Sequence, residues 1–182
     1  MESVKILDKT FEPYITSEQL NKVVKDMAAR MKTDLAGKDV VFVAILNGAF
    51  MFASDLFREI DFPARITFLK MASYVGTSTS GSVKQLIGMN EDLKDKTVVV
   101  IEDIVDTGIT IDLIIKQLEA YGPAEVKVAA LLLKPEAYTK EMKLDYIGLE
   151  IPNRFIVGYG LDYNGYGRNL KDIFVLSEKQ ES

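Results

Sequence analysis

The sequence of 182 residues contains no cysteine and no histidine. Without cysteine, disulfides, thiolate metal ligands and cysteine nucleophiles are excluded. Without histidine, the chain lacks the most common general base, the usual zinc ligand and the serine-type catalytic triads that depend on it. Any chemistry must therefore use carboxylates, lysine, arginine, tyrosine, hydroxyl groups and backbone amides.

The chain also has fewer basic than acidic residues: 22 lysines and arginines against 27 aspartates and glutamates give a formal net charge of -5. This balance provides no basic surface of the kind that binds nucleic acid. No apolar run reaches the roughly 18 residues of a membrane-spanning helix, and the first residues lack the pattern of a signal peptide. We expect a cytoplasmic protein with neither a nucleic-acid nor a membrane partner.

The length fits one domain, residues 1–182, and a hydrophobic content of 48% is ample for its core. Thr16 and Gln19 form a capping-box pattern that begins an amphipathic helix, which Gly37 ends. Helical patterns at 49–60 and 110–121 alternate with apolar runs at 40–46, 66–71, 97–101 and 125–133. This alternation predicts an α/β fold, a mostly parallel sheet with helices on both faces. From about Lys134 the pattern becomes irregular, and we expect the terminal segments to form a small hood over the site.

The most informative segment is 98–110, in which an apolar run is followed by Glu102, Asp103 and a short polar turn that opens a helix. Ligands of parallel α/β sheets bind beyond the carboxyl ends of the strands, where a helix N-terminus offers amides to a phosphate. Thr107, Gly108 and Thr110 suit a phosphate-binding turn, because glycine permits close approach and hydroxyl groups donate. The segment has neither the Gly-Lys-Ser/Thr of a Walker loop nor the three spaced glycines of a dinucleotide fingerprint. The simpler alternative is that Asp103 or Asp106 only caps the helix.

These residues resemble the signature loop of type I phosphoribosyltransferases, and the rest of the chain is similar to the family branch that uses 6-oxopurines. The resemblance extends from about Leu46 to Leu176. It includes the run Leu46-Asn47-Gly48-Ala49, a pair Ser73-Tyr74 within a small-residue stretch, Lys134, the run 155–163 that starts with Phe155, and Arg168. Membership implies magnesium-dependent purine salvage: the 5-phosphoribosyl group of phosphoribosyl pyrophosphate is transferred to N9 of hypoxanthine and guanine, giving IMP or GMP and pyrophosphate.

The resemblance also implies a role for each matching residue. Asp106 is the expected general base at N7 of the purine, and Ser73 and Tyr74 belong to a flexible catalytic loop. The ribose and its 5-phosphate are assigned to Glu102, Asp103, Asp106, Thr107, Gly108, Ile109 and Thr110. Pyrophosphate is assigned to Asn47, Gly48 and Arg168. The purine is assigned to Lys134, Phe155, Ile156 and Asp162, and Mg²⁺ to Glu102, Asp103 and Asp162.

Two departures from the family pattern concern phosphate binding. Asn47 stands where the family often has a basic residue, so we expect that contact to use backbone amides. Ile109 stands where a more polar residue is usual, and we expect its side chain to point away from the phosphate. We expect neither change to abolish activity.

Several of the assigned residues also have a simpler interpretation. Lys134 is otherwise a surface lysine whose stem lies along apolar residues, and Arg168 is a surface charge. Phe155 is otherwise a core aromatic residue, and Asp162 a turn residue.

Other functions remain open for the chain as a whole. Some relatives of this fold sense phosphoribosyl pyrophosphate and regulate transcription, whereas sister enzymes use xanthine or adenine. A lysine donates hydrogen bonds only, so Lys134 argues against adenine. Exposed apolar residues expected on the helix between Phe50 and Phe57 favour a homodimer or homotetramer.

Overall fold

The computed structural model describes residues 2–72, 84–87 and 91–178. Ser73 and Tyr74, the expected flexible catalytic loop, lie outside these ranges. Within them, no helix combines the length and the hydropathy that crossing a bilayer requires.

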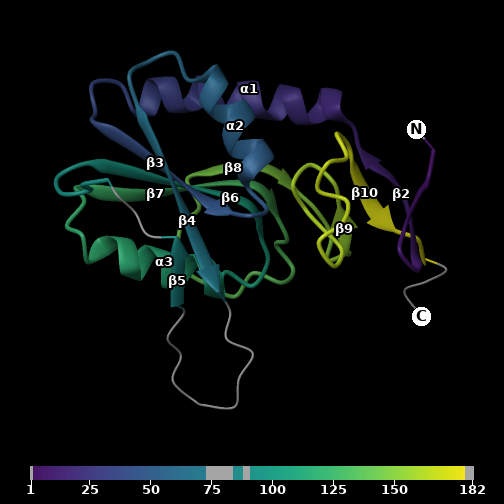
Figure 1. Ribbon diagram of the computed structural model, residues 1–182. Coiled ribbons are helices and arrows are strands. Elements are labelled where there is room, and N and C mark those ends of the chain that lie inside the picture. Colours follow the sequence, from purple (N-terminus) through teal and green to yellow (C-terminus); the bar gives the residue numbers. More distant parts are fainter. Residues whose placement is uncertain (1, 73–83, 88–90, 179–182) are drawn as a thin grey trace.

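A six-stranded sheet forms the centre of the molecule (Figure 1). Its strands are parallel except β5, which runs antiparallel to β4 at one edge. The strand order is β5 (Lys84–Ile87), β4 (Arg65–Ala72), β3 (Val40–Leu46), β6 (Thr97–Val105), β7 (Glu125–Leu133) and β8 (Tyr146–Glu150). The parallel α/β architecture predicted from the alternating apolar and helical segments is therefore confirmed.

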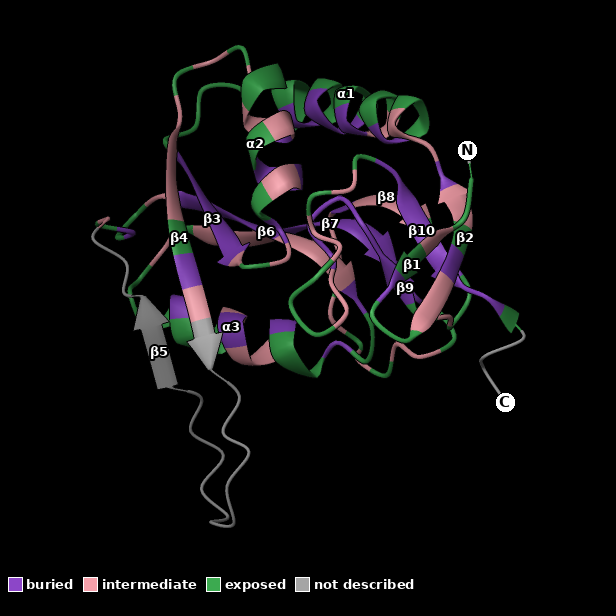
Figure 2. Ribbon diagram, turned by 45° about the vertical axis from the view of Figure 1, so that its right-hand side comes forward, coloured by how far each residue is buried: buried purple, intermediate pink, exposed green. Residues whose placement is uncertain are grey.

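Helices cover both faces of this sheet. Figure 2 shows that the strands between the helices are largely buried. Helices α1 (Ser17–Asp34) and α2 (Phe50–Glu59) pack against one face, to which β6 contributes Val99 and Ile101. Helix α3 (Ile109–Glu119) packs against the other face, together with Val98 and Val100. Successive strand residues point to opposite faces, so an uninterrupted apolar run can supply both layers.

The predicted capping box at the start of α1 is present. The Thr16 hydroxyl accepts a hydrogen bond from the Gln19 amide at 3.1 Å, and the Gln19 side chain accepts one from the Thr16 amide at 2.9 Å. These bonds satisfy amides that a helix N-terminus leaves without intrahelical partners. This start is therefore encoded locally.

A smaller antiparallel sheet forms the hood beside the main sheet (Figure 1). Its order is β1 (Val4–Ile6), β2 (Lys9–Ile15), β10 (Ile173–Leu176) and β9 (Ile156–Val157). The two ends of the chain thus meet in one sheet, and its small core contains Phe11 and Phe174. The expectation of a hood from the terminal segments is confirmed, although the sequence patterns did not reveal β1, β2 and β10 individually.

Strand β6 is longer than its apolar run, which predicted a strand over 97–101. It continues to Val105, and its pairing with β7 includes Glu102 opposite Ala130 and Val105 opposite Leu133. Backbone pairing persists where the apolar pattern stops, so the two carboxylates lie within the strand rather than after it. Glu102 and Asp103 consequently project from opposite faces of the sheet.

Candidate active site

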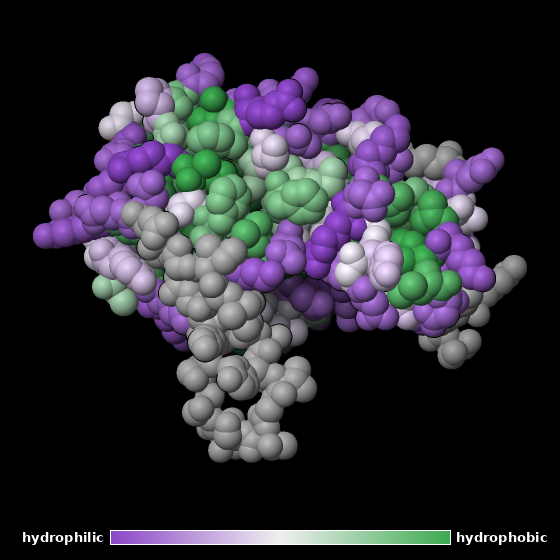
Figure 3. Space-filling model, in the orientation of Figure 1, coloured by the Kyte–Doolittle hydropathy of each residue, from purple (hydrophilic) through white to green (hydrophobic). Residues whose placement is uncertain are grey.

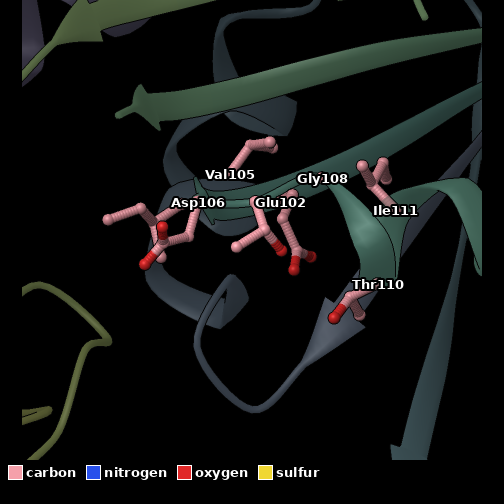
Figure 4. A pocket seen from close by; sticks show the side chains of 8 residues that line it. Glu102, Val105, Asp106, Gly108, Thr110 and Ile111 are labelled. Carbon is pink, nitrogen blue, oxygen red and sulfur yellow. The ribbon is translucent and has the colours of Figure 1, made fainter. Parts of the chain in front are cut away.

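The turn between β6 and α3 surrounds a small cavity of about 90 Å³ (Figure 4). Such a volume suits a few water molecules or one phosphate group. Gly108 is the N-cap of α3, in the left-handed conformation with φ of 82°, and the side chain that accepts from the first amide of this helix, Ile109, is that of Thr107 at 3.4 Å. The alternative that Asp103 or Asp106 merely caps α3 is therefore wrong. The cavity is lined by Glu102, Ile104, Val105, Asp106, Thr107, Gly108, Thr110 and Ile111.

The side chain of Ile109 is not among the residues that line this cavity, and the residue is 53% exposed. An apolar residue is thus accommodated in the phosphate turn because its side chain lies outside. The turn itself still offers the amides and hydroxyl groups that an anion needs.

The connection between β7 and β8 covers the phosphate turn. The amide and the hydroxyl group of Thr139 both donate to the Thr107 carbonyl oxygen, at 3.2 and 3.1 Å. A Cβ atom on Gly108 would lie 2.6 Å from the Tyr138 ring. Glycine is therefore required both for the left-handed backbone and for the close approach of the tyrosine. The sequence patterns did not identify Tyr138 or Thr139.

The carboxyl group of Glu102 is directed toward the start of α3, near Thr110 (Figure 4). Its Oε2 atom is buried and has no hydrogen-bond partner within the described part of the chain. Burial, together with the nearby charge of Asp103, raises the pKa of Glu102 well above its usual value. A buried carboxyl oxygen without a partner is costly, so the site favours a ligand that donates to it.

Asp103 lies on the opposite face, against the loop that follows β3. A Cβ atom on Gly48 would lie only 1.7 Å from Oδ2 of Asp103, so the missing side chain provides the space for this carboxylate. Burial raises the pKa of Asp103 to about 6, opposed by the Ile104 amide, which donates at 2.9 Å, and by the charge of Arg168. The Leu46–Asn47 peptide bond of this loop is cis, and Asn47 is exposed.

Arg168 and Asp162 form an ion pair near Asp103, whose pKa responds to both charges. Arg168 Nη2 lies 2.7 Å from Asp162 Oδ1, and its Nη1 donates to the Gly160 carbonyl oxygen at 2.6 Å. Asp162 also accepts a hydrogen bond from the Gly165 amide at 2.6 Å. The guanidinium is thus fixed by two partners on the Asp103 side of the sheet, rather than being an isolated surface charge.

Lys134, at the end of β7, is only 8% exposed. Its Nζ lies 3.4 Å from Asp106 Oδ2 and 3.2 Å from Asn153 Oδ1. The alternative of a solvated surface lysine is therefore wrong. Asn153 was not predicted, because an asparagine after a proline is typical of an ordinary turn.

Phe155 is 44% exposed, so it is not a core residue. Its ring is supported by Phe11 at a centroid distance of 6.2 Å and by Tyr163 at 5.9 Å. Ile156, by contrast, has its side chain in the core and pairs with Val175 of β10. Only its backbone is therefore available to a ligand. The contribution of Phe11 from the N-terminal strand was not foreseen.

The carboxylates of the site are few and spread over two faces of the sheet. Within residues 2–72, 84–87 and 91–178, no three Asp, Glu, His or Cys side chains come together as a metal-binding group. This arrangement suits Mg²⁺ held by one or two carboxylates, substrate phosphates and water rather than a cage of protein ligands. Asp103, with Asp162 nearby, fits such a role, whereas Glu102 projects from the other face of β6.

A parallel sheet with a glycine-containing turn and carboxylates at its carboxyl edge is the arrangement typical of α/β proteins that bind phosphate esters. Residues 15–164 match the phosphoribosyl transferase domain. The chain belongs to the phosphoribosyltransferase family.

Similar proteins include hypoxanthine-guanine phosphoribosyltransferases of two bacteria. The Streptococcus pneumoniae protein is 37% identical over 166 residues, which cover 91% of this chain and 92% of the relative. The Mycobacterium tuberculosis protein is 33% identical over 172 residues, which cover 91% of this chain and 85% of the relative.

Solved structures show the same similarity. A hypoxanthine phosphoribosyltransferase from Staphylococcus aureus superimposes with a TM-score of 0.87 at 35% identity, covering 94% of both chains. A mutant of the hypoxanthine phosphoribosyltransferase from Trypanosoma cruzi gives a TM-score of 0.86 at 32% identity, covering 94% of this chain and 97% of the other.

Proposed function

We propose that this protein transfers the 5-phosphoribosyl group of phosphoribosyl pyrophosphate to N9 of hypoxanthine and of guanine, releasing pyrophosphate. The observation that supports it most is the Lys134–Asp106 pair, with Nζ and Oδ2 3.4 Å apart. A 6-oxopurine carries an acceptor at O6, and its neighbouring N7 is a donor when it holds a proton. Lysine offers a donor to O6 and the carboxylate an acceptor to N7–H. The exposed Phe155 ring is available to stack on the base.

The remaining roles in the proposal follow the positions of the side chains. Thr107, Gly108, Ile109 and Thr110, together with Asp106, bind the 5-phosphate, with Ile109 and Asp106 contributing only their amides. Glu102 and Asp103 bind the ribose hydroxyl groups from the two faces of β6. Arg168, Asn47 and Gly48 bind pyrophosphate, where a fixed guanidinium opposes the charge that develops on the leaving group.

Asp106 is the proposed general base in this reaction. As the bond to N9 forms, its carboxylate takes the proton from N7, which avoids a positive charge on the purine. Its position beside the ammonium of Lys134 keeps it oriented before the base binds. When the base binds, the ammonium of Lys134 donates a hydrogen bond to O6 in place of part of its interaction with Asp106.

The proposed cofactor is Mg²⁺, held by Asp103 and Asp162, whereas Glu102 binds the ribose from the other face of β6. Bound magnesium would neutralise the pyrophosphate oxygens as the sugar carbon loses its leaving group. Asp103 must be ionised for this task, and its pKa of about 6 permits that at neutral pH.

We treat the whole chain as one domain, whose part from about residue 134 contributes to the purine site. A homodimer or homotetramer remains a prediction, as does the cytoplasmic location. Figure 3 shows hydrophobic side chains gathered over α2 and the neighbouring strand β4, where Phe50 is 42% and Phe68 is 40% exposed. These residues support self-association through that face.

The direct test is a pyrophosphate-release assay with phosphoribosyl pyrophosphate, Mg²⁺ and, in parallel, hypoxanthine, guanine, xanthine or adenine. We expect release with hypoxanthine and guanine and little with adenine. Equal background release with all four bases would contradict the proposed reaction. If pyrophosphate were released only with adenine or only with xanthine, the protein would still be a phosphoribosyltransferase, but the proposed purine substrate would be wrong.

A further inference from the structure

A buried hydrogen bond joins the hood to α2 close to the proposed pyrophosphate site. The phenol of Tyr159 donates to Oδ2 of Asp55 at 2.7 Å, and Tyr159 is 5% exposed. Tyr159 also has a φ of 50°, in the left-handed region that a bulky residue seldom adopts. Burial and the bond to Asp55 raise the pKa of Tyr159 above its usual value, so its phenol remains a donor at neutral pH.

The backbone next to Tyr159 rests directly on the loop after β3. A Cβ atom on Gly160 would lie 2.1 Å from the carbonyl oxygen of Gly48. Gly48 in turn leaves the space that the Asp103 carboxylate occupies. The hood therefore contacts the loop that follows β3, and this loop contacts Asp103. A shift of the hood would change the position of Gly48 relative to the Asp103 carboxylate.

Residues 159–160, which we call the hood turn, also hold Arg168. The Gly160 amide donates to the Arg168 carbonyl oxygen at 3.0 Å, and the guanidinium returns a hydrogen bond to the Gly160 carbonyl oxygen at 2.6 Å. The Tyr159 amide donates to the Leu170 carbonyl oxygen at 2.8 Å and fixes the other side of the turn. The orientation of Arg168 thus depends on where residues 159–160 lie relative to α2.

We propose that Asp55 and Tyr159 are positioning residues for pyrophosphate: their hydrogen bond holds the hood turn against α2 and thereby aligns Arg168 with the Gly48 loop. This inference rests on the proposed function, because it assigns pyrophosphate to that subsite. Neither side chain needs to touch the substrate. The purine side, with Lys134 and Phe155, does not depend on this bond.

The experiment compares variants that remove or retain the bond. Tyr159→Phe and Asp55→Ala remove it, whereas Asp55→Asn keeps an acceptor for the phenol. The matched control is Asp8→Ala, which removes another tyrosine–carboxylate bond of the hood, from Tyr163 to Asp8 at 2.9 Å, on its exposed side. For each protein we would measure KM for phosphoribosyl pyrophosphate, KM for hypoxanthine, the melting temperature, and the Kd of pyrophosphate with Mg²⁺ by calorimetry.

We expect Tyr159→Phe and Asp55→Ala to raise the pyrophosphate Kd and the KM for phosphoribosyl pyrophosphate by roughly 5- to 50-fold. The KM for hypoxanthine should change by less than about 2-fold, because the purine contacts remain. Asp55→Asn should stay near the wild type, and Asp8→Ala should leave the pyrophosphate Kd unchanged, because its partner Tyr163 packs against Phe155 on the purine side. The double variant Tyr159→Phe/Asp55→Ala should be no worse than either single one, since both remove the same bond.

Three results would overturn the positioning role. One is a lower melting temperature with unchanged pyrophosphate Kd, which would make the bond purely structural. The second is an equal loss for both substrates, and the third is a loss in Asp55→Asn as large as in Asp55→Ala. The calorimetric measurement separates this inference from the proposed reaction. A wild-type protein that binds pyrophosphate but transfers to no base would contradict the reaction alone, whereas one that binds neither pyrophosphate nor phosphoribosyl pyrophosphate would overturn both.

Discussion

Replacing Asp103 by asparagine should make the magnesium-free protein more stable at neutral pH. The carboxyl group has a pKa of about 6 in the folded protein, against 3.8 for a freely solvated aspartate, chiefly because of burial. One pKa unit corresponds to about 1.4 kcal/mol, so the difference of about two units sets an upper bound of about 3 kcal/mol. Asp103 keeps some exposure to solvent, which reduces the expected gain to about 1–2 kcal/mol.

The sign of the pH dependence follows from proton linkage. The folded protein binds the Asp103 proton more tightly than the unfolded chain does, so this group favours folding at low pH. Ionisation of Asp103 lowers the free energy of unfolding as the pH rises from about 4 to about 6, and this loss stays constant at higher pH. Other groups behave in the opposite way. The bond with Lys38 lowers the pKa of Glu125 to about 2, for example, so only the difference between wild type and variant isolates Asp103.

The assay is urea unfolding of wild type and Asp103→Asn in EDTA between pH 5 and pH 8. The stability advantage of the variant should increase with pH up to about 6.5 and then level off. Asp26→Asn, at an exposed carboxylate of α1, serves as the control for the loss of one carboxylate. An advantage that does not change with pH, or a variant less stable than wild type at pH 8, would refute the reasoning.

Three further substitutions test separate parts of the site. Lys134→Met should lower kcat/KM for hypoxanthine by roughly 10- to 200-fold and narrow its lead over adenine in parallel assays; an unchanged preference would assign O6 to another group. Asp106→Asn should lower kcat by roughly 10- to 10,000-fold while calorimetry still detects binding of phosphoribosyl pyrophosphate, and unchanged turnover would remove it as the base. Gly48→Ala should weaken pyrophosphate binding, because its Cβ would lie 1.7 Å from Asp103 Oδ2 and must displace that carboxylate. Calorimetry with pyrophosphate and Mg²⁺ checks this, and an unchanged Kd would show that the carboxylate position does not matter.

Local sequence patterns determined most of the regular structure. The strand β7 spans the predicted residues 125–133, and Thr16 is the N-cap of α1 with both hydrogen bonds of its capping box. These features depend on side chains within a few positions of each other, so the sequence reveals them directly. The phosphate turn was found for the same reason, because its glycine, hydroxyl groups and carboxylates are contiguous.

Strand β6 shows where local patterns reach their limit. Its apolar run ends at Ile101, but pairing with β7 extends the strand to Val105. Hydrogen bonds between strand backbones do not depend on apolar side chains, so the pattern could not reveal this extension. The separation of Glu102 from Asp103 onto opposite faces followed from it.

Tertiary structure alone decided the contacts between distant segments. Asn153 approaches Lys134, Phe11 supports Phe155, and Tyr159 bonds to Asp55 across 104 positions of the sequence. The cis peptide bond at Leu46–Asn47 likewise has no sequence signal of the kind that proline provides. An asparagine after a proline, an aromatic residue in a terminal strand and a tyrosine between glycines each have an ordinary local role. Their part in the site arises only when the fold brings α2, the phosphate turn and the hood together.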